Sequence, residues 1–174
     1  DKDAAQEVVL HVYDLSDDKI LRAANEVFSR LGTGAFHVGV EVFGREWSYG
    51  YKEGGATGVF HSKPGRCPAR SYRQGIKLGR TSLDSNEVLA VLAQLRKEWL
   101  GCHYDPVRHN CGHFCDEFCS RLLVEGVPKW VANLANVGAA VKDVFDGLRK
   151  AGSLVEAAAV VAATNAGGRP QIRL

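Results

Sequence analysis

The chain has 174 residues, a length typical of one domain with a short extension. Hydrophobic residues make up 45% and charged residues 24%, which is the composition of a globular protein with a packed core. The formal net charge of +2 is small for this length and gives no reason to expect nucleic acid as a partner.

Cysteine usage and the apolar segments indicate the compartment. Four of the five cysteines lie between Cys102 and Cys119, whereas a secreted disulfide scaffold would spread them along the chain. We therefore expect free thiols in a cytoplasmic protein, with the nucleus as a second location. The polar start of the chain does not resemble a secretory signal. Leu154–Ala163 contains Glu156 and is too short to cross a bilayer, so no integral membrane span is expected.

The first part of the chain has the patterns of β-strands. Glu7–Asp14 is a short apolar run typical of a buried strand, and Phe36–Phe43 alternates as a strand with one buried face does. Gly44-Arg45 fits a two-residue hairpin turn, so Glu46–Tyr51 is the expected partner strand.

A third short strand over Thr57–His61 would complete an antiparallel meander. Lys63–Tyr72 contains two prolines and a glycine and is expected to be a loop. Helical periodicity follows at Asp84–Trp99, where Asp84 and Glu87 resemble a capping box, and at Cys111–Glu125, which Gly126 would cap. Further short helices are expected at Asp17–Leu31, Val131–Val137, Val141–Leu148 and Ala151–Ala163.

The segment around Cys111 carries the clearest chemical signal. Asn110 is a strong N-cap residue and places Cys111 in the first turn of a helix, where backbone N–H groups lack partners and the helix dipole is positive. Such a position lowers a thiol pKa, and the same N–H groups can stabilise an oxyanion. Gly112 leaves room for a substrate carbonyl. Asn110 and Gly112 are therefore the expected cap and oxyanion region of a nucleophilic Cys111.

His37 is the preferred base for this thiol among the six histidines. His113 lies two positions along the same helix and points away from Cys111, and His109 is too close in sequence to be aimed freely. His37 begins a strand whose same face carries only Gly39 next to it, so an imidazole there has room to meet a helix N-terminus.

Less specific interpretations compete with this one. Free cysteine is often simply buried, and Cys115 and Cys119 follow Cys111 at helical spacing, which favours packing for both. A zinc site is the other chemical alternative, but two helical turns spread these three cysteines over about 12 Å, beyond one coordination sphere. We expect no bound metal and no cofactor.

These blocks, in this order, resemble the PPPDE family, whose members include the DeSI deSUMOylating isopeptidases. The resemblance runs from about Glu7 to Gly138 and includes the strand around His37, the Gly44–Gly50 hairpin, the Asn110–Phe114 block and the Pro128–Ala135 segment. The hairpin is most similar to that of the second DeSI subgroup. Gly112 departs from the asparagine that the family often has there.

The resemblance implies a permuted papain-like fold of the α/β (α+β) class, with an antiparallel sheet packed on helices. It places the nucleophile on Cys111 and the base on His37, as a dyad without a third residue. The expected domain covers residues 7–138, followed by a helical extension over 139–163 and a flexible tail over 164–174. The implied reaction is cleavage of ubiquitin or SUMO from protein conjugates through a thioester intermediate.

Three other possibilities remain open at this stage. Some relatives are associated with palmitoyl-thioester cleavage, and the Asn110–Phe114 block also resembles that of lecithin:retinol acyltransferase-like lipid enzymes. A catalytically silent module that binds a ubiquitin-like modifier is the non-enzymatic alternative. Homodimerisation is possible, since exposed sheet edges permit it.

A narrow groove beside Cys111 is the expected substrate site. It would be lined by Trp47, Tyr49 and His109 and would accept the Gly-Gly end of a modifier through backbone hydrogen bonds. The alternative is that both aromatic residues only pack on the sheet.

Overall fold

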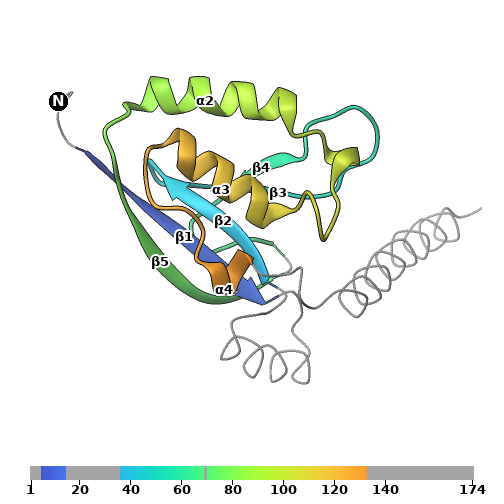
Figure 1. The fold of residues 1–174 in the computed structure, drawn as a ribbon, viewed down its shortest axis with the longest axis horizontal. Helices are drawn as coiled ribbons and strands as arrows, with labels where there is room; N and C mark the ends of the chain where they lie inside the picture. The colour runs from blue at the N-terminus through green and yellow to red at the C-terminus, as the bar shows by residue number, and fades with distance from the viewer. Residues whose placement is uncertain (1–4, 15–35, 69, 133–174) are drawn as a thin grey trace, which may run out of the picture. The chain divides into compact units, whose positions relative to one another are not determined.

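The structure is a computed structural model that describes residues 5–14, 36–68 and 70–132 (Figure 1). The chain divides into two compact units, 1–138 and 139–174, and all described residues belong to the first. The helix expected over Asp17–Leu31 lies outside the described residues, as do the helices expected at Val141–Leu148 and Ala151–Ala163, the extension over 139–163 and the tail over 164–174. Of the helix expected over Val131–Val137, only the first two residues are described.

The described segments form five strands, three α-helices and a 3₁₀ turn. In chain order these are β1 (Gln6–Asp14), β2 (Phe36–Val42), β3 (Arg45–Tyr49), β4 (Val59–Ser62), β5 (Ser71–Thr81), α2 (Ser85–Glu98), the 3₁₀ turn (Gly101–His103), α3 (Cys111–Arg121) and α4 (Lys129–Ala132). None of the described helices is long and apolar enough to cross a bilayer.

The five described strands make one antiparallel sheet in the order β4-β3-β2-β1-β5. β2, β3 and β4 form the expected meander, and β1 pairs with β2 from Val9↔Glu41 to Asp14↔Phe36. This sheet with its packed helices confirms the α+β class that the family resemblance implies.

One face of the sheet carries the hydrophobic core. α2 and α3 lie on the same side of the sheet (Figure 1), and α2 faces the β2–β3 hairpin. Alternation along β2 sends every second side chain towards these helices, as expected for a strand with one buried face. The core includes Phe36, Val38, Val40 and Val42 from β2, Val88, Leu92 and Leu95 from α2, and Phe114, Phe118 and Leu122 from the α3 region.

The β2–β3 hairpin turns one residue earlier than expected. Val42 pairs with Arg45, so the two central residues are Phe43 and Gly44, not Gly44 and Arg45. Their φ angles are +50° and +70°. Positive φ at both central residues is the property of a type I′ turn, whose twist matches that of the flanking strands.

Two further expectations are wrong. β5 occupies Ser71–Thr81, where the sequence indicated a loop up to Tyr72 and no strand after it. α3 ends at Arg121, four residues before the expected end. There Leu123 takes a left-handed φ of +60°, and Leu123 and Val124 donate to the carbonyls of Ser120 and Cys119, which is the hydrogen-bond pattern of a Schellman motif.

Candidate active site

Cys111 is the first residue of α3, and Asn110 is the N-cap. The Asn110 side chain accepts hydrogen bonds from the backbone N–H groups of Gly112 (2.9 Å) and His113 (3.2 Å). The His113 ring accepts in turn from the Asn110 backbone N–H at 3.2 Å and closes a capping box. The cap therefore fixes the first turn of the helix and uses two of its unpaired N–H groups.

The Cys111 thiol lies against β2 beside His37. Its Sγ donates to the Phe36 carbonyl at 3.8 Å, and one helical turn later the Cys115 Sγ donates to the Val38 carbonyl at 3.6 Å. Phe36 and Val38 are the two neighbours of His37 in the chain. The regular β2–β3 register stops at Val40↔Trp47, so α3 meets β2 beyond the point where the β2–β3 pairing ends.

The His37 side chain belongs to the other alternation of β2, with Gly39 and Glu41. Its Nε2 is 3.0 Å from Ser48 Oγ, and its ring stacks nearly parallel to Phe60, with 6.1 Å between centroids. The Tyr13 ring is 6.1 Å away and tilted. His37 is only 5% exposed, so three neighbouring strands hold the ring in place.

Burial dominates the protonation of both groups. It raises the pKa of the Cys111 thiol, against hydrogen bonds from the Val38 backbone and the Tyr104 side chain that lower it. Burial, followed by the positive charge of Arg70, lowers the His37 pKa to about 3. Both shifts favour the uncharged forms at neutral pH. The expected lowering of the thiol pKa by the helix start is outweighed, because Cys111 is only 2% exposed.

The space above Gly39 is filled, contrary to the idea that His37 has an open strand face beside it. A Cβ at Gly39 would lie 2.5 Å from Oε1 of Glu46, whose side chain is buried. Oε2 of Glu46 accepts from the Tyr13 hydroxyl at 2.6 Å and from the Gly65 N–H at 2.9 Å. Glu46 thus ties the loop after β4 to the sheet face that carries His37.

Of the three residues expected to line a groove, Tyr49 and His109 lie in one aromatic cluster with Trp99, and Trp47 lies apart from it. Tyr49 is fully buried and donates its hydroxyl to the Leu100 carbonyl at 2.7 Å, while His109 stacks on Trp99 with 4.0 Å between centroids. Trp47 is 5% exposed and packs edge-on against His61. This burial matches the packing alternative for Trp47 and Tyr49.

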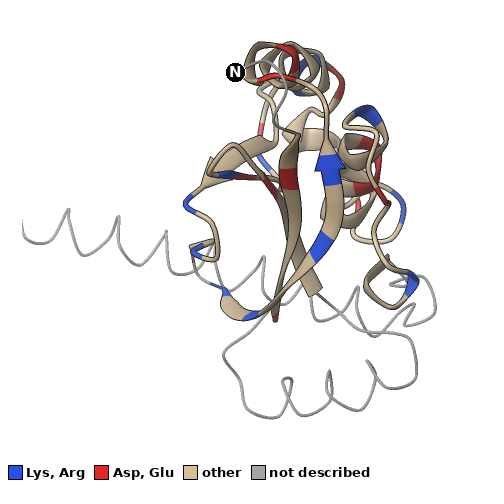
Figure 2. Ribbon diagram, turned by 90° about the vertical axis from the view of Figure 1, so that its left-hand side faces the viewer, with Lys and Arg blue, Asp and Glu red and all other residues tan. Residues whose placement is uncertain are grey.

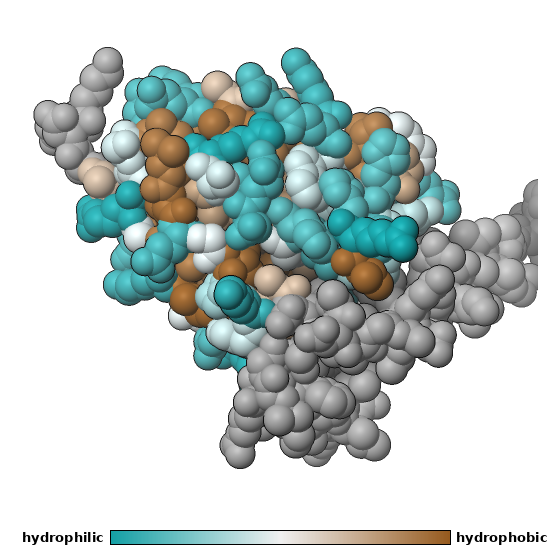
Figure 3. All heavy atoms as spheres, in the orientation of Figure 1, coloured by the Kyte–Doolittle hydropathy of each residue, from teal (hydrophilic) through white to brown (hydrophobic). Residues whose placement is uncertain are grey.

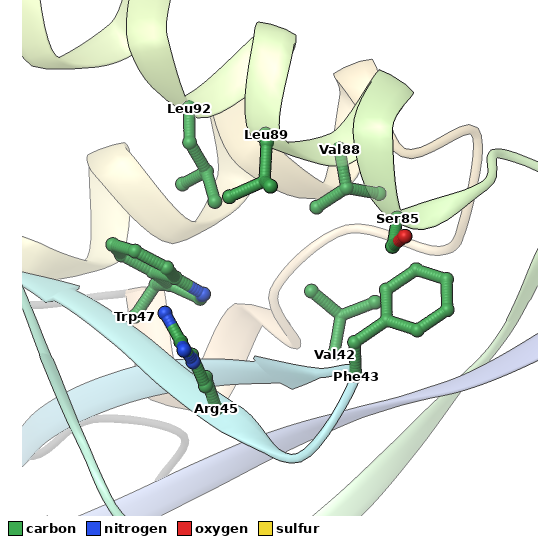
Figure 4. A pocket seen from close by; sticks show the side chains of 8 residues that line it. All are labelled: Val42, Phe43, Arg45, Trp47, Ser85, Val88, Leu89 and Leu92. Atoms are coloured by element: carbon green, nitrogen blue, oxygen red, sulfur yellow. The ribbon is translucent and has the colours of Figure 1, made fainter.

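A pocket of about 230 Å³ lies between the β2–β3 hairpin and α2 (Figure 4). Its lining residues are Val42, Phe43, Arg45, Trp47, Ser85, Val88, Leu89 and Leu92. Val42 is five residues from His37 along β2, or about 17 Å at the rise of a strand. The pocket is therefore separate from the surroundings of Cys111.

The surface of the described residues carries mixed charge and separate apolar patches. Lys and Arg alternate with Asp and Glu along the ribbon in Figure 2. On the face that Figure 3 shows, hydrophobic residues form patches divided by hydrophilic ones. Phe60, at 36% exposure, is the exposed aromatic residue that also contacts His37.

The described residues hold no group of three or more His, Cys, Asp or Glu side chains arranged to bind a metal ion. All five cysteines are described, and each is a free thiol. Cys115 and Cys119 are fully buried among core residues. Burial raises the Cys115 pKa well above its usual value and the Cys119 pKa to about 12, so both thiols stay protonated at neutral pH.

Three residues near Cys111 and His37 had no sequence signal of their own. Tyr104 precedes the helix and hydrogen bonds to Cys111. Ser48 and Phe60 lie on β3 and β4 and reach His37 across the sheet. The alternation of β3 already placed Ser48 on the other face of the strand from Trp47 and Tyr49. Only the strand register shows which histidine Ser48 faces.

Comparisons with a family model and with individual proteins point to the same family. The model of the "PPPDE putative peptidase domain" family matches residues 6–147. A DeSI-like protein of Arabidopsis thaliana is 33% identical over 131 residues, which are 75% of this chain and 56% of the relative. A desumoylating isopeptidase 1 homolog of Caenorhabditis elegans is 28% identical over 77% of this chain and 40% of its own length. A DeSI-like protein of Schizosaccharomyces pombe is 30% identical over 83% and 72%. The chain thus spans about half the length of the first two relatives.

Proposed function

Because the chain belongs to the PPPDE peptidase family, we propose that it is a thiol isopeptidase that releases ubiquitin or SUMO from protein conjugates. Cys111 is the nucleophile and His37 the base. The observation that carries the assignment is the position of the Cys111 sulfur, at the start of a helix and 3.8 Å from the carbonyl that precedes His37.

The reaction starts from an uncharged pair. His37 takes the thiol proton as the Cys111 sulfur attacks the isopeptide carbonyl, and the carbonyl oxygen becomes negative in the tetrahedral intermediate. The intermediate collapses when His37 returns the proton to the leaving lysine amine. The modifier is then held as a thioester, which water hydrolyses with His37 again acting as base. A neutral Cys111–His37 pair suits this order of steps, because burial penalises a resting thiolate–imidazolium pair.

The developing oxyanion needs hydrogen-bond donors. Asn110 already uses the N–H groups of Gly112 and His113. We assign the oxyanion to the Cys111 N–H and the Tyr104 hydroxyl, which hydrogen bonds to the same sulfur.

The substrate class is inferred from the relatives and not from Cys111 and His37. The printed name of the C. elegans relative describes a desumoylating isopeptidase, which favours a modifier conjugate over a palmitoyl or lipid acyl group. All these reactions pass through an acyl-thioester at Cys111, so chemistry alone does not distinguish them. A silent binding module is disfavoured by the hydrogen bonds that position both Cys111 and His37.

Activity-based probes test the proposal directly. Ubiquitin and SUMO with an electrophile at the C-terminal glycine, and a palmitoyl probe, are each incubated with the chain, and the modified cysteine is identified by mass spectrometry. We expect a modifier probe to label Cys111, with labelling lost in Cys111→Ala and strongly slowed in His37→Ala. Labelling by the palmitoyl probe alone would reject modifier conjugates as the substrate class and favour palmitoyl thioesters. Modifier binding without any labelling would favour the silent module.

A further inference from the structure

Ser48 hydrogen bonds across the sheet to His37 and to the residue that follows it in β2. It lies on β3, is 2% exposed, and its Oγ is 3.0 Å from His37 Nε2 and 2.5 Å from the carbonyl oxygen of Val38. A carbonyl oxygen can only accept a hydrogen bond, so the Ser48 hydroxyl donates its single proton to Val38. The Ser48 oxygen must then accept from His37, and the donor is the Nε2–H.

This arrangement fixes the tautomer of His37. A neutral imidazole carries one proton, so a protonated Nε2 leaves the lone pair on Nδ1. Nδ1 is the ring nitrogen nearer the backbone, and the Cys111 sulfur lies against the peptide that precedes His37. The nitrogen that can accept a proton is thus Nδ1, and the reaction proposed above requires the Cys111 thiol proton to pass to it.

The location of Ser48 in the sheet allows this role. The β2–β3 register ends at Val40↔Trp47, immediately before Ser48. From there the hydroxyl, and not a ladder hydrogen bond, bridges β3 to Val38. Cys115 donates to the same carbonyl from α3 at 3.6 Å, so Val38 is held without Ser48 as well.

We propose that Ser48 is a positioning residue for the reaction, which orients His37 as the base for Cys111. The proposal rests on the function proposed above. Ser48 holds His37 in the Nε2–H tautomer and continues to accept from Nε2 when the ring takes the thiol proton. The buried imidazolium that forms during catalysis is therefore never without an acceptor for its Nε2–H.

NMR of the resting protein tests the tautomer without any substrate. The ring nitrogens of ¹⁵N-histidine-labelled protein report which nitrogen carries the proton, and His37→Gln identifies the His37 signals among the six histidines. We expect a pure Nε2–H form at pH 7 and a mixture in Ser48→Ala. An Nδ1–H form in the wild type would overturn the proposal.

Kinetics test the consequence for catalysis on a fluorogenic C-terminal amide of the modifier that labels Cys111. Ser48→Ala should lower kcat by about tenfold to a hundredfold with KM little changed, since a hydrogen bond to a charged group is lost. Ser48→Thr, which keeps the hydroxyl, should restore much of the rate. Cys115→Ala is the matched control, because it removes the other donor to Val38 and should leave both tautomer and kcat unchanged.

The outcomes separate the two proposals. Unchanged tautomer and kcat in Ser48→Ala, with only a lower Tm, would show a purely structural role and reject the positioning role. Absence of probe labelling would instead reject the isopeptidase function, while the NMR result would still decide the hydrogen-bond arrangement at His37.

Discussion

At the scale of single residues, Cys111 experiences two opposing influences. The helix start and the hydrogen bonds from Val38, Tyr104 and Gly112 favour the thiolate, whereas burial favours the thiol and dominates. Cys115 and Cys119 are buried without the same compensation. The difference between these thiols is therefore one of partners and not of exposure.

This difference predicts the order of alkylation. Cys111 should react with iodoacetamide faster than Cys115 or Cys119, and its rate should rise with pH because its pKa is raised. Exposed Cys102 serves as an internal reference that labels early. Brief alkylation at several pH values, followed by peptide mass spectrometry, measures all four rates. Equal rates for Cys111, Cys115 and Cys119 would contradict selective activation.

Tyr104→Phe tests the proposed oxyanion donor. Loss of one donor of this kind typically lowers kcat by about 10²–10³-fold. We expect a loss in that range with little change in KM, measured with the fluorogenic modifier amide. Tyr49→Phe is the control, since it removes another buried tyrosine hydroxyl whose partner is the Leu100 carbonyl. A similar loss in both variants would point to a general packing defect.

At the scale of elements, the β2–β3 turn depends on the left-handed conformation of Gly44. A Cβ at Gly44 meets no atom within 4 Å, so Gly44→Ala adds backbone strain without a clash. We expect a loss of about 1–2 kcal/mol in urea unfolding. Gly55 also has open space and its φ is outside the left-handed region, so Gly55→Ala should change stability by less than about 0.5 kcal/mol. Equal losses would argue against the type I′ turn.

Neighbouring strands β3 and β4 present two aromatic residues in different environments. Trp47 is core, so Trp47→Ala should cost about 3–5 kcal/mol of stability. Phe60 is exposed beside His37, so Phe60→Ala should lower kcat/KM about tenfold, at a smaller cost in Tm. Melting curves and steady-state kinetics on both variants separate the roles. Normal kcat/KM in Phe60→Ala would show that the Phe60 contact with His37 is not needed for the reaction.

The elements that the sequence predicted well have strong local signals. The Asp84–Glu87 capping box starts α2, and alternation defines β2. β5 was missed because, among its eleven residues, only Leu78 and Thr81 are buried, and its two glycines and irregular register hide the alternation. Its strand conformation comes from pairing with β1, which is distant in sequence.

The same distinction applies to the site. Asn110 and Cys111 are adjacent in the chain, so their relation at the helix start was visible from the sequence. Ser48 and Phe60 lie 11 and 23 positions after His37, and only the sheet register brings them to it. The burial that reverses the expected thiol pKa is a property of the packed core and has no local sequence pattern.

At the scale of the whole molecule, His37 couples stability to pH. Its pKa falls from an ordinary 6.5 to about 3 in the folded state. Below pH 6.5 the unfolded chain therefore binds a proton that the folded chain does not, and stability is lost as the pH falls from about 6.5 towards 3. This one group contributes a slope of up to about 1.4 kcal/mol per pH unit.

Urea unfolding of the wild type and His37→Gln between pH 8 and 4 measures this contribution. The wild type should lose stability faster than the variant below pH 6.5, because glutamine does not titrate. The two curves should run parallel above that pH. Parallel curves over the full range would mean that His37 titrates with the same pKa in the folded and unfolded protein.

The contact between Cys111 and the Phe36 carbonyl also limits which inactive variant can be used to form a stable complex with a substrate. Serine is the usual oxygen replacement for a nucleophilic thiol, but a hydroxyl needs its acceptor at about 2.7–2.8 Å, whereas the sulfur lies at 3.8 Å. A serine at 111 would have to turn or draw β2 towards α3 to find the same partner. An inactive Cys111→Ser variant used to capture the conjugate would thus bind it in an altered site. The side chain at position 111 would not lie where the thiol lies in the active protein.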